Sequence, residues 1–225
     1  MRFVKQKHSA GFSLIELLIS MVVVVLLLGI VSTLLARSLS VRARESRKTD
    51  ALTSAHAALN IMSREIANSG FGIYDGAISQ NAVNGIVLGG DSSLNQIHFR
   101  ANLSNAGDGP TNPSCPAICT NEPGEDVTYF FDDATDSIVR YDPNGNPTTS
   151  VIVNKISDVT FSYFDYASDG TVTAEPGNAN PSINTGRVRL TVDVTLDKVL
   201  GQPDESVRFT SEINLRNSSY MLRQY

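Results

Sequence analysis

The chain has 225 residues, enough for one or two small domains but not for a large multidomain enzyme. Its net charge of −5 excludes a generally basic nucleic-acid binder, and its hydrophobic content of 41% excludes a disordered chain and a polytopic membrane protein. The charge is uneven: +3 over residues 1–11, +2 over residues 12–70 and −10 over residues 71–225. The chain therefore consists of three segments of different composition.

A long apolar run begins at Phe12. Nineteen of the 25 residues from Phe12 to Ala36 are apolar. A helix of that length is about 37 Å long and can cross a bilayer core of about 30 Å. The run is longer than the apolar region of a secretory signal, and it is apolar on every face, unlike a surface helix. It predicts a membrane-spanning helix, with a cleaved signal and a buried core helix as the alternatives.

Glu16 is the one ionisable residue in this run. A carboxylate at the centre of a membrane helix costs roughly 2.5–3.5 kcal/mol, and less near the helix end, where Glu16 lies. Two interpretations remain open. Either the side chain reaches the lipid headgroups and has no further role, or it meets a positive partner inside an assembly.

The segment from Lys7 to Leu17, KHSAGFSLIEL, resembles the leader and mature start of type IV pilins and of type II secretion pseudopilins. It has a basic leader, a glycine, a phenylalanine and a glutamate before a long apolar helix. The resemblance implies cleavage between Gly11 and Phe12 by prepilin peptidase, followed by N-methylation of Phe12. It also implies that Glu16 pairs with the N-terminal amine of a neighbouring subunit, which sets subunit register in the filament. Gly11 presents no side chain at the scissile bond, so the backbone can be approached closely.

The basic residues that follow the apolar run complicate the topology. They outnumber the three basic residues of the leader, so the positive-inside rule alone favours the opposite orientation. They are Arg37, Arg42, Arg44, Arg47 and Lys48. The leader motif requires Gly11 in the cytoplasm, and we follow it. The basic cluster then faces solvent, lipid headgroups or acidic neighbours in a fibre.

The helix is predicted to continue to Ser69, because no proline or glycine occurs between Ile30 and that residue. Apolar residues at spacings of three and four place one stripe on the second half of this helix. They are Leu52, Ala55, Leu59, Met62 and Ile66. Gly70 and Gly72 provide a stop signal. The stripe predicts docking on a soluble head, with a coiled coil as the alternative.

The remainder of the chain predicts an antiparallel, β-rich head. Residues 187–197 and 207–215 alternate between apolar and polar side chains, as strands with one buried face do. Further strands are expected at 85–88, 96–100, 126–131, 137–141, 150–154 and 159–166, and an exposed loop at 170–186. The expected fold is thus α+β and type IV pilin-like. Its segments are a leader (1–11), a transmembrane half-helix (12–36), an amphipathic periplasmic half-helix (37–70) and a head (71–225).

A second, looser resemblance extends over most of the chain. Residues 58–72 resemble the end of the long helix in PilW-type minor pilins and in J-type pseudopilins, and 127–130, 137–141 and 156–163 resemble strands of that group. The resemblance implies a minor pilin of a Gram-negative bacterium that acts in pilus assembly and initiation at the tip, with roles in twitching motility and adhesion. Implied partners are prepilin peptidase, other minor pilins, the major pilin and a tip adhesin. The protein would span the inner membrane once, with its head periplasmic, before joining a fibre at the cell surface. A J-type pseudopilin of a type II secretion system is the alternative.

The two cysteines, Cys115 and Cys119, are close in sequence. In a head outside the cytoplasm their oxidation to a local disulfide is expected. A zinc site is the alternative, although Cys-x₃-Cys is only half of a ligand set, and His56 and His98 have no motif spacing to it.

We expect no cofactor and no enzymatic activity, because the common catalytic fingerprints do not occur. The segment 142–147 begins like a calcium loop, but Pro147 and Val153 occupy positions that an EF-hand gives to glycine and a bidentate acid. We therefore interpret 142–147, and likewise 132–136, as turns, and calcium binding remains only an alternative. A membrane-anchored module that binds a surface or DNA is a third hypothesis, in which arginines 187, 189 and 208 would form a local basic strip.

Overall fold

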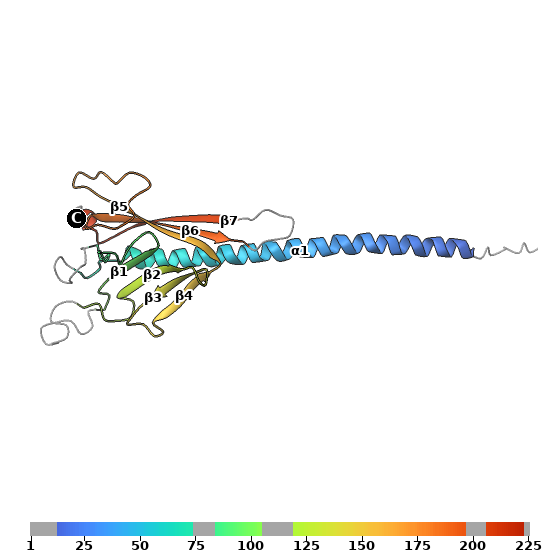
Figure 1. Ribbon diagram of the computed structural model, residues 1–225, viewed down its shortest axis with the longest axis horizontal. Coiled ribbons are helices and arrows are strands. Elements are labelled where there is room, and N and C mark those ends of the chain that lie inside the picture. The colour runs from blue at the N-terminus through green and yellow to red at the C-terminus, as the bar shows by residue number, and fades with distance from the viewer. Residues whose placement is uncertain (1–12, 74–83, 105–118, 197–205, 223–225) are drawn as a thin grey trace, which may run out of the picture. The chain divides into compact units, whose positions relative to one another are not determined.

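The computed structural model describes residues 13–73, 84–104, 119–196 and 206–222 (Figure 1). The chain divides into two compact units, Met1–Arg47 and Lys48–Tyr225. Helix α1 (Leu14–Ala67) belongs to both units. In the first unit it is the one described element, and in the second unit its last turns are part of a packed core.

Helix α1 ends close to the predicted position. Its last residue is Ala67, and Gly70 and Gly72 follow with φ angles of 78° and 68°, the left-handed conformation that glycine adopts without strain. The buried face of α1 is formed by Ala55, Ala58, Leu59, Met62 and Ile66. Four of these belong to the predicted stripe. Because they pack into the core of their own chain, the coiled-coil alternative is wrong for this stripe.

The strands form two antiparallel sheets, which confirms the expected α+β class. The four-stranded sheet has the order β1-β2-β3-β4, and the three-stranded sheet has the order β5-β6-β7. The elements are β1 (Gln96–Arg100), β2 (Asp126–Asp132), β3 (Ser137–Tyr141), β4 (Thr149–Asn154), β5 (Ile156–Asp165), β6 (Thr185–Thr195), β7 (Ser206–Asn214) and the short helix α2 (Ser219–Leu222).

The chain passes from one sheet to the other at a single residue. Lys155 lies between β4 and β5 and has a φ angle of 62°, an uncommon conformation for a residue with a side chain. The sheets remain in contact beyond this point, because the N–H of Phe161 in β5 donates to the carbonyl of Leu94 at 2.6 Å. The Tyr163 hydroxyl donates to the Gln96 carbonyl at 3.1 Å.

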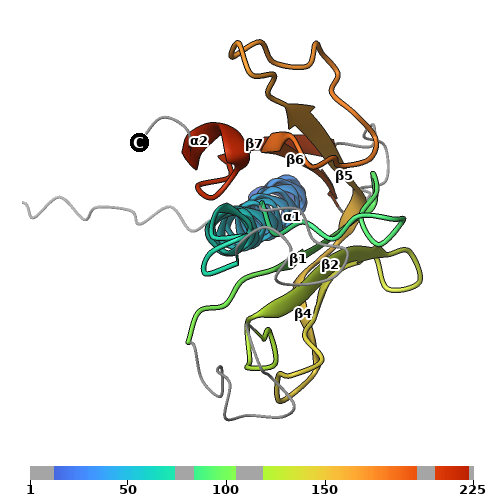
Figure 2. The ribbon, with the colours of Figure 1, turned by 90° about the vertical axis from the view of Figure 1, so that its left-hand side faces the viewer.

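One hydrophobic core joins both sheets to the C-terminal part of α1. Figure 2 looks along the helix and shows both sheets beside its cyan turns. Alternate residues of β6 are buried, as their spacing predicts: Val188, Leu190, Val192 and Val194. In β7, at the outer edge of its sheet, only Ile213 is fully buried, while Phe209 is half-buried and its ring centroid lies 4.7 Å from that of His56 in α1.

Two segments differ from expectation. Residues 85–88 form no strand, because only an isolated bridge joins Ile86 to Phe99. The loop predicted at 170–186 contains no strand as far as residue 184, but its last two residues, Thr185 and Gly186, already belong to β6. The loop also folds back along β5 through bridges from Val172 to Tyr166 and from Asn178 to Tyr163. The sequence pattern also did not indicate helix α2.

Candidate functional site

The first turn of α1 holds the carboxylate of the apolar run. The backbone N–H of Ser13 donates a hydrogen bond of 3.1 Å to Glu16 Oε2. This is one half of a capping box, and it places a negative charge at the positive end of the helix dipole. Within the described part of the chain, Oε1 of Glu16 makes no hydrogen bond. Among the described residues, this oxygen therefore has no donor, and it can accept a hydrogen bond.

The apolar surface of α1 has no cover from its own chain. An 18-residue window of this helix has a mean hydropathy of 3.0, is long enough and apolar enough to cross a membrane, and has none of its residues buried. The large apolar side chains between Leu14 and Val41 are 48% to 86% exposed. The buried-core alternative is therefore wrong for this segment. A surface of this size requires lipid or neighbouring apolar helices around it.

Several predicted site residues lie outside the described part of the chain: Gly11, Phe12 and Cys115. Cleavage and methylation at Gly11 and Phe12 therefore remain predictions. Cys119 is described and half-buried, and its disulfide with Cys115 likewise remains a prediction.

Glu65 joins the helix to the four-stranded sheet within the second unit. Its Oε2 atom accepts hydrogen bonds from the Tyr129 hydroxyl at 2.7 Å and from Arg140 Nε at 3.0 Å. Arg140 also donates to Asp142 Oδ2 at 3.1 Å. Burial, together with the neighbouring carboxylate, raises the pKa of Tyr129 well above its ordinary value. The phenol therefore remains a protonated donor to Glu65.

The predicted turn at 142–147 connects β3 to β4, and its first residue has a structural role. The Asp142 side chain is 2% exposed and accepts hydrogen bonds from the backbone N–H groups of Gly124 and Asn144. Asp132 similarly accepts from the N–H of Ala134 in the turn between β2 and β3. In the described residues, no group of three or more His, Cys, Asp or Glu side chains is arranged to hold a metal ion.

The three arginines of the suggested basic strip point away from the core on neighbouring strands, but each is ion-paired. The pairs are Arg187 with Glu212, Arg189 with Glu175 and Glu212, and Arg208 with Asp193. A nucleic-acid phosphate would have to displace these carboxylates from the arginines. The strip is therefore not an exposed positive surface.

Sequence reasoning missed the contacts that join distant segments. Glu65 and Tyr129 are 64 residues apart, and no motif connects them. The Ser13–Glu16 contact could have been found, because Ser-x-x-Glu before an apolar run is the sequence pattern of a capping box.

A scan against protein families matched residues 6–32 to the prokaryotic N-terminal methylation motif. Searches of curated proteins and of solved structures found no match to the chain. The matched motif covers residues 6–11 of the expected leader, the expected cleavage position, Glu16 and the exposed apolar helix as far as residue 32. The N-terminal segment thus carries the prokaryotic N-terminal methylation motif, and this match supports a pilin-like or pseudopilin-like protein.

Proposed function

We propose that this protein is a minor pilin of the type IV pilus, of the PilW type, and that it acts in pilus assembly and initiation at the tip. One observation carries the proposal. The methylation motif coincides with a carboxylate in the first turn of a helix whose apolar surface the chain leaves uncovered. A membrane and then neighbouring pilin helices would cover that surface in turn.

Processing precedes assembly in this proposal. Prepilin peptidase cuts between Gly11 and Phe12 on the cytoplasmic side, and Phe12 is then N-methylated. The apolar helix holds the subunit in the inner membrane, with its head in the periplasm. Loss of the leader removes three basic side chains, which leaves a mature chain with a side-chain charge of −8.

Glu16 acts as the registration residue. Its free Oε1 accepts a hydrogen bond from the N-terminal amine of a neighbouring subunit, while Oε2 remains on the Ser13 N–H. In hydrocarbon an unpaired carboxylate and an unpaired ammonium are both costly. Only one axial offset between neighbouring helices pairs the Glu16 carboxylate with the N-terminal amine of the next subunit. At other offsets both charges remain unpaired.

The head supplies the contacts that distinguish this subunit from the major pilin. Its partners would be other minor pilins, the major pilin and a tip adhesin, and its loss would impair twitching motility and adhesion. The network of Glu65, Tyr129 and Arg140 is consistent with this role, because it anchors the last turns of α1 in the head. A contact between the head and a partner would therefore also fix the position of these helix turns.

A J-type pseudopilin of a type II secretion system is the second candidate, because the methylation motif occurs in both groups. The neighbouring genes distinguish the two: further minor pilin genes favour the pilus, and secretion-system genes favour the pseudopilin. A deletion strain gives the functional test. Loss of surface pili with normal protein secretion supports our proposal, and normal piliation with lost secretion supports the alternative.

A further inference from the structure

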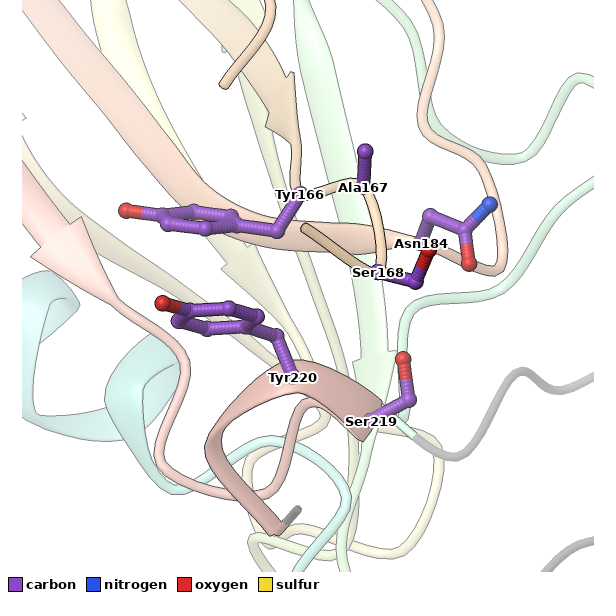
Figure 3. A pocket seen from close by; sticks show the side chains of 6 residues that line it. All are labelled: Tyr166, Ala167, Ser168, Asn184, Ser219 and Tyr220. Atoms are coloured by element: carbon purple, nitrogen blue, oxygen red, sulfur yellow. The ribbon is translucent and has the colours of Figure 1, made fainter. Parts of the chain in front are cut away.

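A pocket of about 350 Å³ opens where the ends of β5 and β6 meet the C-terminal helix α2. Three segments that are distant in sequence line it (Figure 3): residues 166–168 after β5, Asn184 before β6, and Ser219 with Tyr220 in α2. The volume lies at the lower end of the range for small-molecule sites. Neither the methylation motif nor the proposed role in assembly accounts for this pocket.

Two stacked tyrosines form a wall of the pocket. The rings of Tyr166 and Tyr220 have centroids 4.7 Å apart and an interplanar angle of 27°, and Figure 3 shows one ring stacked above the other. A Cβ atom on Gly186 would come within 2.6 Å of Tyr166 Cδ2, so the Tyr166 ring packs directly against glycine backbone. The stack holds α2 against the end of the sheet and keeps the wall in place.

The polar side chains of the pocket are not used by the fold. In the described part of the chain, the hydroxyls of Ser168 and Ser219 and the side-chain amide of Asn184 make no hydrogen bond. Adjacent polar side chains do: Ser182 Oγ accepts from the backbone N–H of Asn184 at 3.0 Å, and Thr185 Oγ1 donates to a carboxylate at 2.7 Å. The unused groups converge on one pocket, as they do in ligand sites.

The chemistry of these groups defines the ligand. None of the six lining residues is charged, so a charged ligand would lose hydration without gaining a counter-ion. Hydroxyl and amide groups both donate and accept hydrogen bonds, which suits a ligand that carries many hydroxyls of its own. We propose that this pocket binds a neutral saccharide.

A peptide fits the pocket less well. Peptides recognised through their main chain need free backbone groups on the protein. Here the N–H of Tyr166 already donates to the Asn184 carbonyl at 3.0 Å, and the N–H of Ala167 donates to the Thr171 carbonyl at 2.8 Å. The available groups are side-chain hydroxyls and an amide in a small hollow.

Because the pocket is open and Asn184 and Ser168 are exposed, we expect the affinity of the pocket for a monosaccharide to lie in the millimolar range.

Saturation-transfer NMR on the full chain tests the proposal. The protein is held in lauryldimethylamine oxide micelles, because alkyl-glycoside detergents would compete for the pocket. The probes are glucose, galactose, N-acetylglucosamine and lactose, with glucuronate, glucosamine and a capped neutral dipeptide as comparators. The test variant is Asn184→Ala with Ser219→Ala, which removes two of the three free polar groups and leaves the tyrosine stack intact. The control is Asn154→Ala, another exposed asparagine, at the end of β4.

We expect saturation transfer to at least one neutral saccharide, a loss of at least five-fold in affinity in the double variant, and no change in Asn154→Ala. Tyr220→Phe keeps the stack, and we expect it to retain most of the binding. The proposal is overturned if no neutral saccharide binds, if the double variant binds as the parent does, or if only the dipeptide or a charged sugar binds. None of these results bears on processing at the N-terminus, so this test and that of the proposed function can fail independently.

Discussion

The hydroxyl of Tyr129 donates a hydrogen bond of 2.7 Å to Oε2 of Glu65, and this contact joins strand β2 to the last turns of helix α1. Arg140 in β3 donates to the same oxygen at 3.0 Å. Two adjacent strands are therefore fixed to the helix by one carboxylate oxygen. Because the Tyr129 ring is fully buried, the contact also determines which face of the helix meets the sheet.

Replacing Tyr129 with phenylalanine tests this contact. The substitution removes one hydrogen bond to a carboxylate and keeps the buried ring, so we expect a loss of about 1–2 kcal/mol in the free energy of unfolding. Chemical denaturation of the full chain in micelles, followed by near-UV tyrosine circular dichroism, measures it. Tyr141→Phe is the control, because Tyr141 is 43% exposed and should change stability little. Equal stability of the two variants would contradict the anchoring role of Tyr129.

Gly85 and Gly89 form a matched pair for a second prediction. Both have positive φ angles, 76° and 86°, so alanine strains the backbone similarly at each. A Cβ atom at Gly85 would lie 2.1 Å from the backbone nitrogen of Gly70, whereas one at Gly89 would meet nothing within 4 Å.

We therefore expect Gly89→Ala to cost about 1 kcal/mol and Gly85→Ala about 3 kcal/mol or more, because only the latter must displace the backbone after α1. The midpoint of thermal unfolding, measured for both variants under the same conditions, gives the comparison. Similar midpoints would show that the segment 84–87 does not pack against the end of α1 as described.

Asp126 makes part of the stability dependent on pH. Burial alone would raise the pKa of Asp126, but hydrogen bonds from His98 and Arg100, with the charge of Arg100, outweigh it and lower the pKa below its ordinary value. A carboxyl whose pKa is lowered on folding contributes stability above its unfolded pKa of about 4, and loses it as pH falls through the folded value.

We expect Asp126→Asn to be less stable than the parent by about 1–2 kcal/mol at pH 7, and expect the difference to shrink below pH of about 4. Denaturation curves at pH 7 and at pH 3 measure it. A difference that stays constant between these two pH values would show that the Asp126 charge contributes nothing to folding.

The fold could be predicted where the pattern is local. The alternation of Val188, Leu190 and Val192 identified the buried face of β6, because side-chain direction in a strand has a period of two. The spacing of Leu59, Met62 and Ile66 identified the face of α1 that meets the head. The division of the strands into two sheets could not be predicted, because the chain changes sheet at Lys155, whose left-handed conformation no glycine marks in the sequence.

The two candidate sites, Glu16 and the pocket, also differ in whether the sequence could predict them. Glu16 could be identified because a carboxylate is costly in an apolar run and because its motif is contiguous. The pocket beside Tyr166 and Tyr220 could not, because its residues come from three separate segments and are uncharged types that also occur in ordinary loops. Only the three-dimensional packing brings their unused hydrogen-bonding groups together.

Replacing Glu16 with alanine separates membrane insertion from assembly. Removing the carboxylate lowers the cost of placing the helix in hydrocarbon, so we expect insertion and processing to be retained. Recovery of the subunit in sheared surface fibres should fall at least ten-fold, because alanine cannot pair with the N-terminal amine of the neighbouring subunit and so cannot set the axial offset between the helices. Glu45→Ala, at the next acidic residue along α1, is the control and should assemble normally. Normal assembly of Glu16→Ala would contradict the registration role.

The most direct test of the central claim is the intact mass of the protein after co-expression with prepilin peptidase, compared with that of a Gly11→Leu variant. We predict that the parent chain loses residues 1–11 and gains one methyl group at Phe12, while the variant keeps its leader and gains none. An uncut parent chain, or a variant that is cut and methylated like the parent, would contradict the assignment of the N-terminal segment as a prepilin leader and mature start.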